Sequence, residues 1–432
     1  MVNQGNWIFS CPSPAFGRVE KGFYNAGPMT ADDRNGPTWE DSRMQIVSCV
    51  TEVDFESYVK CLEEAGYAGY LRHNIGSDRV FACEKDGKNY HIRWCAKRKE
   101  LRVIEEPAHV SPRTFGFRAS GEGKTTLYQY GLYYDPDNNM TPKTANCGML
   151  YIIHLCDNSL FMMDGGFLLQ WNEEAMDGLW RFLRRITNTA EDGTVRISCW
   201  YFTHTHADHI DGCVKLLNRH HHQIQLERLM YNFPLYENLG GYEPSAFYVR
   251  DMVAKWYPDA KFLKLHTGQV FNLADVTVEV FYTQEDAVVP EAITKFPMRD
   301  GNCMSAILKL TIGGKTVMML GDTNLETESW LEKYSDPAPW KSDMVQIAHH
   351  CFNYLDTLYS WIEAPVIIVP NSWGGAHQPE NTPKLEGALK FMEGDKVYYE
   401  GGGTDGFVAE EDGWKHITHY PVIGGEYDGS GY

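Results

Sequence analysis

Near the middle of the chain, four side chains that could bind a metal ion fall within six residues. They are His204, His206, Asp208 and His209, in the pattern HxHxDH. Imidazole nitrogen and carboxylate oxygen together suit zinc, iron or manganese. Histidine clusters also occur on surfaces without a function, but the sequence on both sides of this one favours a metal site.

The flanking sequence predicts a tight turn between a strand and a helix. Residues 197–202 are rich in β-branched and aromatic side chains, which is typical of a buried strand. After the motif, Ile210, Val214 and Leu217 recur with the spacing of one apolar helix face. A turn can direct several side chains at one point, whereas a strand sends alternate side chains to opposite faces. We therefore expect the four ligands to converge.

Two later segments end in further candidate ligands. Asp322 follows an apolar run, and a buried carboxylate is costly without a cation or a hydrogen-bond donor. A second apolar run, residues 342–348, leads into His349 and His350. One aspartate at a strand end is more often a cap or a turn residue. Three such segments in one chain favour a shared metal site.

Together these segments resemble the metallo-β-lactamase superfamily. Its HxHxDH signature is matched in full at residues 204–209. The sequence Met-Asp-Gly-Gly around Asp164 is similar to the first motif of that family, and Leu-Gly-Asp ending at Asp322 is similar to its bridging-carboxylate motif. The pair His349 and His350 is similar to its last histidine motif.

The resemblance covers residues 120–425 and implies an α/β fold, an αββα sandwich with metal at one edge. It implies one or two zinc ions, with manganese or iron as alternatives. Asp164 would hold a ligand histidine by a hydrogen bond rather than touch the metal. The implied metal ligands are His204, His206, Asp208, His209, Asp322 and His350.

Within the superfamily, the chain is most similar to the branch with the hydrolase domain of bacterial DNA-uptake channels and the phosphorylcholine esterases. The shared features are Asn302-Cys-Met-Ser305, Glu326 and Glu328 after Asp322, the doubled histidine, and Ala376-His377-Gln-Pro379. Alignment with the superfamily makes the second histidine of the pair the ligand. We therefore expect His350 to bind metal and His349 to face the substrate.

The chain departs from the superfamily at its third motif. The family has a histidine upstream of the bridging aspartate, at the position that Asn302 occupies here. The half-site of His204 and His206 therefore lacks its third histidine, and Asn302 or water would complete it. The other half-site keeps its full set. Either two metals bind unequally or one binds.

The resemblance implies hydrolysis by a metal-activated water. Asp208 could accept the proton of that water, and His349 or His377 could stabilise the oxyanion or protonate the leaving group. His377 could equally be a loop histidine bonded to the backbone. The branch favours a small phosphodiester or phosphate ester as substrate. The alternatives are an amide, lactone or thioester, or a metal-binding protein of this fold without turnover.

Composition limits the partners. The formal charge is −19, whereas binding of a phosphate backbone requires clustered Lys and Arg. A small-molecule substrate is therefore expected and nucleic acid is a disfavoured partner. The 11 cysteines form no CxxC pair, which is typical of a reducing, cytoplasmic setting. No secretion signal and no apolar run long enough to cross a membrane is present, and nothing indicates the oligomeric state.

Residues 1–115 are expected to form an arm and a small domain. The arm is irregular and extends to about residue 45, and the domain that follows it is α+β. In that domain a helix is expected from an N-cap at Asp54 to Ala65, with Phe55, Tyr58, Val59 and Leu62 on its apolar face. Residues 116–432 predict the hydrolase domain, in which strands and helices interleave. Its helices are expected at residues 173–186, 247–256 and 382–392, and its later strands at residues 276–282, 306–312, 315–320, 342–348 and 366–369.

Overall fold

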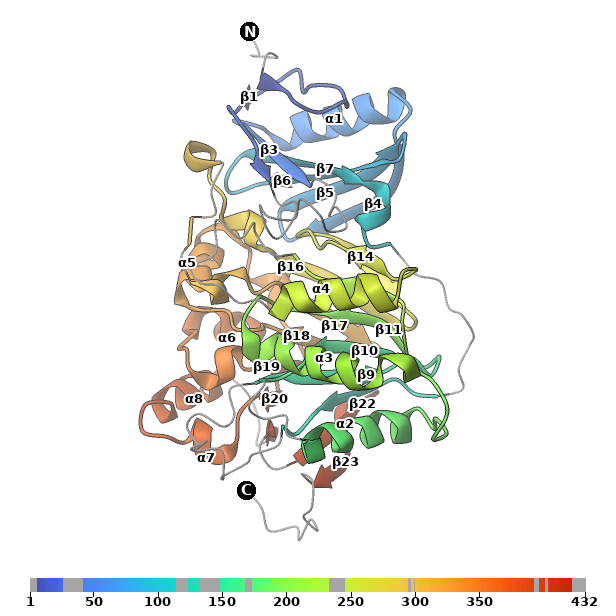
Figure 1. Ribbon diagram of the computed structural model, residues 1–432. Helices are drawn as coiled ribbons and strands as arrows, with labels where there is room; N and C mark the ends of the chain where they lie inside the picture. Colours follow the sequence, from blue (N-terminus) through green and yellow to red (C-terminus); the bar gives the residue numbers. More distant parts are fainter. Residues whose placement is uncertain are drawn as a thin grey trace.

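The computed structural model describes residues 6–25, 42–113, 123–132, 148–167, 173–232, 245–293, 297–298, 300–391, 396–400 and 403–421. The strands in these ranges form three sheets, one near the N-terminal end and two that pack together below it (Figure 1). The predicted domain boundary, between residues 115 and 116, lies outside the described ranges.

The N-terminal sheet is antiparallel, and helix α1 covers one of its faces. Its strands are β1 Arg18–Val19, β2 Tyr24–Asn25, β3 Arg43–Ser48, β4 Ala68–Ile75, β5 Asp78–Lys85, β6 Lys88–Cys95 and β7 Glu100–Pro107. Three of these strands include residues within the predicted irregular arm, so that prediction was wrong in part. Short strands such as β1 and β2 have no periodicity of their own and form by pairing with β3.

Helix α1 spans Glu52–Glu64, and its N-cap is Thr51 rather than the predicted Asp54. The two residues form a capping box, in which the Thr51 hydroxyl accepts from the Asp54 backbone N–H and Asp54 accepts from the Thr51 N–H. Both are good capping residues, and reciprocal bonding at the earlier position satisfies two free N–H groups instead of one. The predicted apolar face is confirmed, since Phe55, Tyr58, Val59 and Leu62 are buried.

The second sheet runs in the order β14-β13-β11-β10-β9-β8-β22-β23, with β12 beside β11. Its bounds are β8 Thr126–Gln129, β9 Leu150–His154, β10 Leu160–Asp164, β11 Val195–Tyr201, β12 Ile224–Leu226, β13 Arg228–Met230, β14 Lys261–Leu263, β22 Gly403–Glu410 and β23 Gly413–Pro421. The helices on its outer face are α2 Glu173–Ile186, α3 Ala207–His220 and α4 Ser245–Trp256.

The third sheet runs in the order β15-β16-β17-β18-β19-β20-β21. Its bounds are β15 Val270–Leu273, β16 Val276–Tyr282, β17 Ile307–Ile312, β18 Lys315–Met319, β19 Met344–Gln346, β20 Val366–Val369 and β21 Lys396–Tyr399. The helices of this half are α5 Leu325–Tyr334, α6 Asp356–Ile362, α7 Trp373–Ala376 and α8 Thr382–Leu389.

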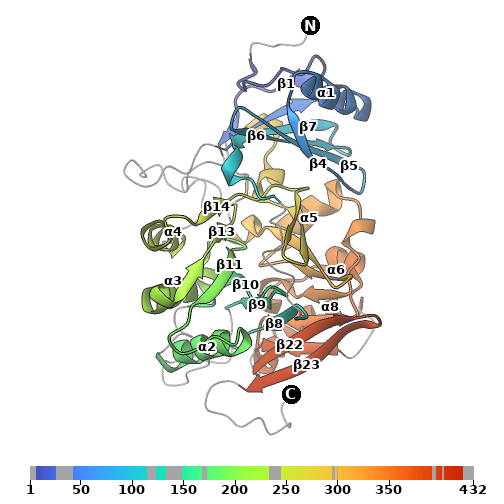
Figure 2. The same cartoon turned by 90° about the vertical axis from the view of Figure 1, so that its right-hand side faces the viewer.

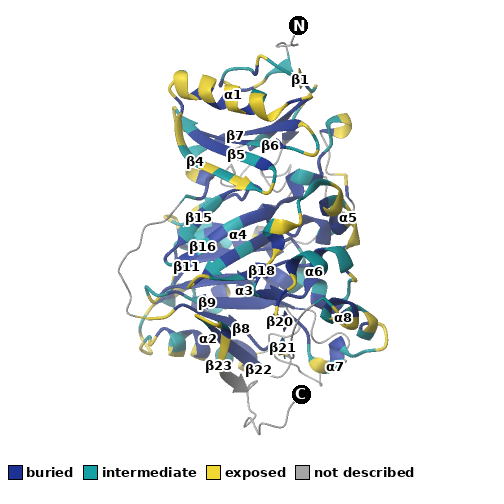
Figure 3. Ribbon diagram, turned by 180° about the vertical axis from the view of Figure 1, so that it is seen from behind, coloured by how far each residue is buried: buried dark blue, intermediate teal, exposed yellow. Residues whose placement is uncertain are grey.

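The buried side chains define four layers. One apolar cluster joins the inner faces of the two sheets, for example Tyr201 and Met163 with Leu308 and Met319. A second joins the outer face of the second sheet to α2, α3 and α4, and a third joins the third sheet to α5, α6 and α8. Figure 2 shows the two sheets between the two sets of helices, and Figure 3 shows the buried strands at the centre. The predicted αββα sandwich is confirmed.

Several predicted boundaries in the hydrolase domain differ from the structure by one or more residues, and two of them differ most. The strand predicted at residues 342–348 is reduced to Met344–Gln346, because the chain turns before the histidine pair. The helix predicted to end at residue 392 ends at Leu389. None of the helices in the described ranges is long and apolar enough to cross a membrane.

Candidate metal centre

The HxHxDH residues are divided between a turn and a helix. His204 lies in the turn after β11, and His206 is the N-cap of α3. Asp208 and His209 belong to the first turn of α3, so the expectation that all four lie on the turn was wrong. A carboxylate in the first turn of a helix is stabilised by the free N–H groups there.

Glycines bring α3 close to the sheet. A Cβ on Gly165 would lie 2.8 Å from the backbone nitrogen of Cys213 in α3. The next residue, Gly166, accepts a hydrogen bond from the N–H of Gly212. The Met-Asp-Gly-Gly sequence thus places α3, and with it Asp208 and His209, directly against the end of β10.

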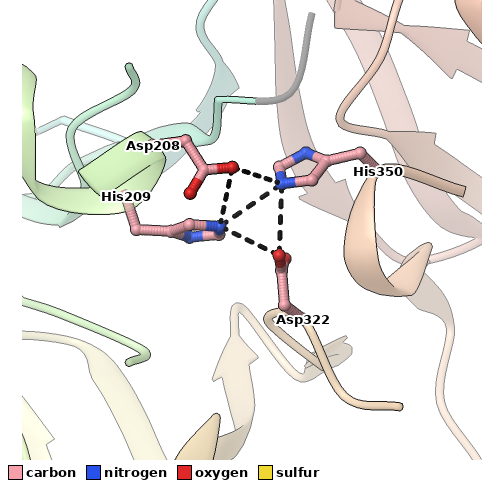
Figure 4. A group of neighbouring side chains, drawn as sticks. All are labelled: Asp208, His209, Asp322 and His350. Carbon is pink, nitrogen blue, oxygen red and sulfur yellow. Dashed lines mark hydrogen bonds and ion pairs between the residues drawn. The ribbon is translucent and has the colours of Figure 1, made fainter. Parts of the chain in front are cut away.

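Asp208, His209, Asp322 and His350 form one cluster, with ligand atoms that all lie within 4.8 Å of one another (Figure 4). The His209 Nε2 is 3.2 Å and the His350 Nε2 is 3.3 Å from the Asp322 Oδ2. The His350 Nε2 is also 3.4 Å from the Asp208 Oδ2. Ligands about 2.0–2.2 Å from a tetrahedral zinc lie about 3.3–3.6 Å apart, so this spacing suits a small divalent ion.

Hydrogen bonds set the tautomers of the two histidines. His209 Nδ1 donates to Asp164 Oδ2 at 2.7 Å, and His350 Nδ1 donates to the Pro370 carbonyl at 3.0 Å. A neutral imidazole carries one proton, so the Nε2 of each ring presents a lone pair. The two Nε2 atoms lie 3.3 Å apart and face the carboxylates of Asp208 and Asp322. Such an arrangement is repulsive unless a positive charge lies between the groups.

Unpartnered atoms support the same conclusion. The His204 Nε2 and the Asp322 Oδ1 are buried and accept no hydrogen bond. Buried polar atoms are normally paired, and an unpaired one requires an explanation such as an ion. The donor set therefore fits a divalent cation.

The charges of the cluster shift its pKa values strongly. Burial lowers the pKa of His209 and of His350, but neighbouring carboxylates outweigh burial and raise both pKa values well above the usual range. These are Asp322, Asp164 and Asp208 for His209, and Asp322 and Asp208 for His350. Burial raises the pKa of Asp322, but His209, His350 and His349 hold it well below its usual range. The cluster thus favours charged carboxylates and a compensating positive charge.

The other half-site is less complete. His204 Nδ1 is 3.0 Å from the Thr203 hydroxyl, and its Nε2 is 3.9 Å from Asp322 Oδ2. The His206 ring lies 4.6 Å from the His204 ring and against Gly301, where a Cβ would be 2.3 Å from His206 Nε2. His206 and His204 do not belong to the four-residue cluster.

Asn302 lies beside His349 rather than in the cluster. Its Nδ2 is 3.4 Å from His349 Nε2, and its Oδ1 is buried without a partner. The Nε2 of His349 is 3.7 Å from Asp322 Oδ2, and this ring is the more exposed of the pair, at 24% against 1% for His350. His349 therefore borders the four-residue cluster from the side open to solvent.

Asp164 makes the hydrogen bonds expected of a residue that supports a ligand. It accepts from the backbone N–H and the hydroxyl of Thr203, each at 2.8 Å, as well as from His209. The Thr203 hydroxyl can therefore accept the Nδ1 proton of His204. One buried carboxylate thus orients two histidines.

His377 has no described contact with the cluster. Its Nδ1 donates to the Trp373 carbonyl at 2.8 Å, and its ring stacks on Trp373 at 4.1 Å. This arrangement corresponds to the second alternative for His377, a loop histidine bonded to the backbone. His266 is bonded through both ring nitrogens to Glu106 and Glu285, at 2.9 and 2.8 Å, and so offers no free nitrogen to the half-site of His204 and His206.

Several residues at the site were given no role from the sequence, although Ser305 belongs to one of the segments that carry the resemblance. The Ser305 hydroxyl accepts from the Asp322 N–H, the Asn353 amide contacts His349, and Pro370 contacts His350. Glu400 is a buried carboxylate after β21, with one unpartnered oxygen. Its position after a strand of the sheet that carries Asp322 is the one clue the sequence offered.

No family model matches the sequence, and no curated protein matches it. Solved structures similar to the fold include YhfI from Bacillus subtilis, a metallo-β-lactamase fold protein, with 11% identity over 64% of this chain and 97% of that chain and a TM-score of 0.37. Zinc-bound PqqB from Methylobacterium extorquens has 10% identity over 65% and 99%, and a TM-score of 0.39. Unliganded PDE1 from yeast has 13% identity over 64% and 97%, and a TM-score of 0.39. The fold is defined by its own sheets and helical layers.

Proposed function

We propose that the protein is a metal-dependent hydrolase whose principal ion, zinc, is held by Asp208, His209, Asp322 and His350. The arrangement that carries the proposal is the convergence of the His209 and His350 Nε2 atoms on the half-buried Asp208 carboxylate and the buried Asp322 carboxylate. Because the Nδ1–H groups of both rings are bonded elsewhere, Nε2 is the atom of each ring that would bind the metal, and without a metal a proton on Nε2 would supply the positive charge.

The bound metal would supply an activated water and polarise the bond under attack. Asp208 is the residue placed to accept a proton, because its carboxylate is 20% exposed whereas Asp322 is 1% exposed. His349 borders the cluster and could donate a proton to the leaving group or stabilise the developing negative charge. A role for His377 in stabilising the oxyanion or protonating the leaving group stays a prediction.

The substrate we propose is a small phosphodiester or phosphate ester. The support for it is the likeness of the sequence motifs to the phosphoesterase branch, together with a proton donor beside the cluster that suits an alkoxide leaving group. An amide, lactone or thioester would use the same groups. The second half-site, with His204 and His206, could hold a weaker ion.

Metal analysis and a substrate screen test the proposal. Protein purified without chelator should hold at least one equivalent of zinc, manganese or iron by mass spectrometry of the metal. It should also cleave bis(p-nitrophenyl) phosphate, and Asp208→Ala should abolish cleavage. Protein that binds no metal would refute the hydrolase, and metal without any turnover would indicate a binding protein. Cleavage of lactones or amides alone would replace the phosphoester as substrate.

A further inference from the structure

The two adjacent histidines have opposite hydrogen-bond partners at Nδ1. His350 Nδ1 faces the Pro370 carbonyl, which can only accept. His349 Nδ1 is 2.8 Å from the side-chain Nδ2 of Asn353. The same Nδ2 is 3.1 Å from the Thr323 carbonyl, so this atom of Asn353 must be the NH₂ nitrogen.

This arrangement determines where the proton of His349 lies. Because Asn353 donates to Nδ1, a neutral His349 ring carries its proton on Nε2. A half-turn of the Asn302 amide, whose nitrogen is 3.4 Å from Nε2, would bring its oxygen to that proton. His350 has the reverse tautomer, with its lone pair at Nε2.

The backbone holds the two rings in different surroundings. His349, His350 and Cys351 are left-handed, with φ of 49°, 51° and 67°. A left-handed conformation is unfavourable for a residue that is not glycine, so other contacts must hold these three residues. The His349 N–H donates to the Gly321 carbonyl beside Asp322, and the NH₂ of Asn353 contacts both the His349 ring and Thr323.

We propose that Asn353 is a positioning residue that holds His349 as the Nε2–H tautomer, so that one histidine of the pair offers a proton while its neighbour binds the metal. Without this amide, His349 could carry its proton on Nδ1 and present a lone pair at Nε2, 3.7 Å from Asp322 Oδ2. It would then compete with His350 as a ligand. The consequence for turnover rests on the proposed hydrolase function, but the tautomer itself does not.

The test is the tautomer of His349 in the zinc-loaded protein, read from ¹⁵N shifts of the imidazole ring in long-range NMR spectra. The signals are assigned by their loss in His349→Gln. The expected wild-type result is a protonated Nε2. In Asn353→Asp the carboxylate would accept from Nδ1, and the proton should move to Nδ1. A wild-type ring protonated at Nδ1, or a tautomer unchanged in Asn353→Asp, would overturn the proposal.

Kinetics give a second readout. A proton donor contributes about 10²–10⁴-fold to rate and matters most for poor leaving groups. Asn353→Asp should therefore lower kcat by about 10²-fold for an alkyl phosphodiester, with little change in KM or for a p-nitrophenyl ester. An equal loss for both substrates would overturn the positioning role. Asn158→Asp is the matched control, because Asn158 also contacts a histidine ring, His154, far from the cluster in an exposed turn.

If the protein hydrolyses none of the substrates, the proposed function fails while the NMR result still decides the tautomer. If Asn353→Asp does not fold, the wild-type spectrum alone tests the assignment, and Asn353→Ala supplies a second variant. In Asn353→Ala nothing would hold the proton of His349 on Nε2, so the ¹⁵N shifts of the ring should report a mixture of the two tautomers.

Discussion

At the scale of single residues, the centre depends on which atom of each histidine carries the proton. Asp164, Pro370 and Asn353 make that choice for His209, His350 and His349. The identity of a residue as histidine is therefore not enough to define a ligand. Its Nδ1 partner must be known as well.

Asp164→Asn should weaken metal binding without removing a ligand. The amide cannot accept from Thr203 and His209 as the carboxylate does, and loss of such a supporting bond typically costs 10–100-fold in metal affinity. Chelator competition measures the change in Kd. Unchanged affinity would show that the Asp164 bond does not orient His209. Asp157→Asn, in the turn before β10, is a control for loss of a largely buried carboxylate that accepts from Ser159 and Arg196 rather than from a ligand histidine.

The two members of the histidine pair should respond differently to truncation. His350→Ala should lose the tightly bound metal, because its Nε2 is one of the four clustered ligand atoms. His349→Ala should keep the metal and lose rate, by about 10²-fold or more for a proton donor. Metal content by mass spectrometry separates the outcomes. If His349→Ala lost the metal while His350→Ala kept it, His349 rather than His350 would be the ligand.

At the scale of elements, the centre forms where three parts of the sandwich meet. The first turn of α3 supplies Asp208 and His209, the end of β18 leads to Asp322, and the turn after β19 supplies His350. Strands β18 and β19 are parallel neighbours, so their carboxyl ends lie at the same edge. The approach of α3 to β10 then closes the cluster from the second sheet.

Gly165→Ala should move α3 and disturb the centre. The added Cβ would lie 2.8 Å from the Cys213 nitrogen, and backbone cannot yield without a shift of the helix. We expect a loss of unfolding free energy of about 1–3 kcal/mol, as for overpacking, together with weaker metal binding. Urea unfolding and chelator competition measure the two effects.

Gly374→Ala is the matched control for this substitution. Gly374 lies in α7, and a Cβ there would meet nothing within 4 Å. The unfolding free energy of Gly374→Ala should equal that of wild type or be slightly higher, because alanine reduces the entropy of the unfolded chain. Equal destabilisation by both substitutions would contradict a specific role for the α3 contact.

At the scale of the whole molecule, the N-terminal sheet supports the segment that borders the centre. Tyr24, Met44 and Ile104 of this sheet share an apolar cluster with Cys303 and Met304. These two residues directly follow Asn302, which contacts His349. We infer that the N-terminal sheet helps to hold this edge of the site in place.

Buried charges join the same two parts. His266 lies between Glu106 of β7 and Glu285, and both its ring nitrogens are bonded to them. Arg93 forms ion pairs with Asp78 and Asp286. Breaking a buried pair leaves an uncompensated charge, which is far more costly than losing a surface pair.

The His266 network predicts a loss of stability at high pH. Burial lowers the pKa of His266, but Glu285 and Glu106 outweigh burial and raise it to about 10, from an ordinary value of 6.5. A raised pKa stabilises the folded state fully below about pH 6.5, and the stabilisation is lost as the pH rises through about 10. The unfolding free energy should therefore fall by a few kcal/mol, roughly, between these pH values.

Glu106→Gln should reduce that dependence. Removing one carboxylate lowers the pKa of His266, so the variant should be less stable than wild type near pH 7 and closer to it near pH 10.5. Urea unfolding of both proteins at the two pH values measures the gap, and the comparison cancels other groups that titrate in this range. If the difference in unfolding free energy between wild type and Glu106→Gln were as large near pH 10.5 as near pH 7, His266 would not be charged in the folded protein.

The sequence by itself determined the local structure and the types of ligand. Apolar periodicity placed α2 at its observed bounds, Glu173–Ile186, and the order of strands and helices indicated the layers. The HxHxDH motif, Asp322 and the histidine pair indicated a metal site, because imidazole and carboxylate groups after apolar runs are costly to bury without a cation.

Only the tertiary structure decided how these groups meet. The left-handed turn at His349, the Pro370 carbonyl at His350 and the Asn353 amide depend on contacts that no local pattern encodes. The same holds for Glu106, which reaches His266 across 160 residues. A ligand needs a particular tautomer, and a tautomer is set by the partner on the opposite side of the ring. That partner lies next to the histidine in space, whereas its position along the chain is set by the way strands and loops pack.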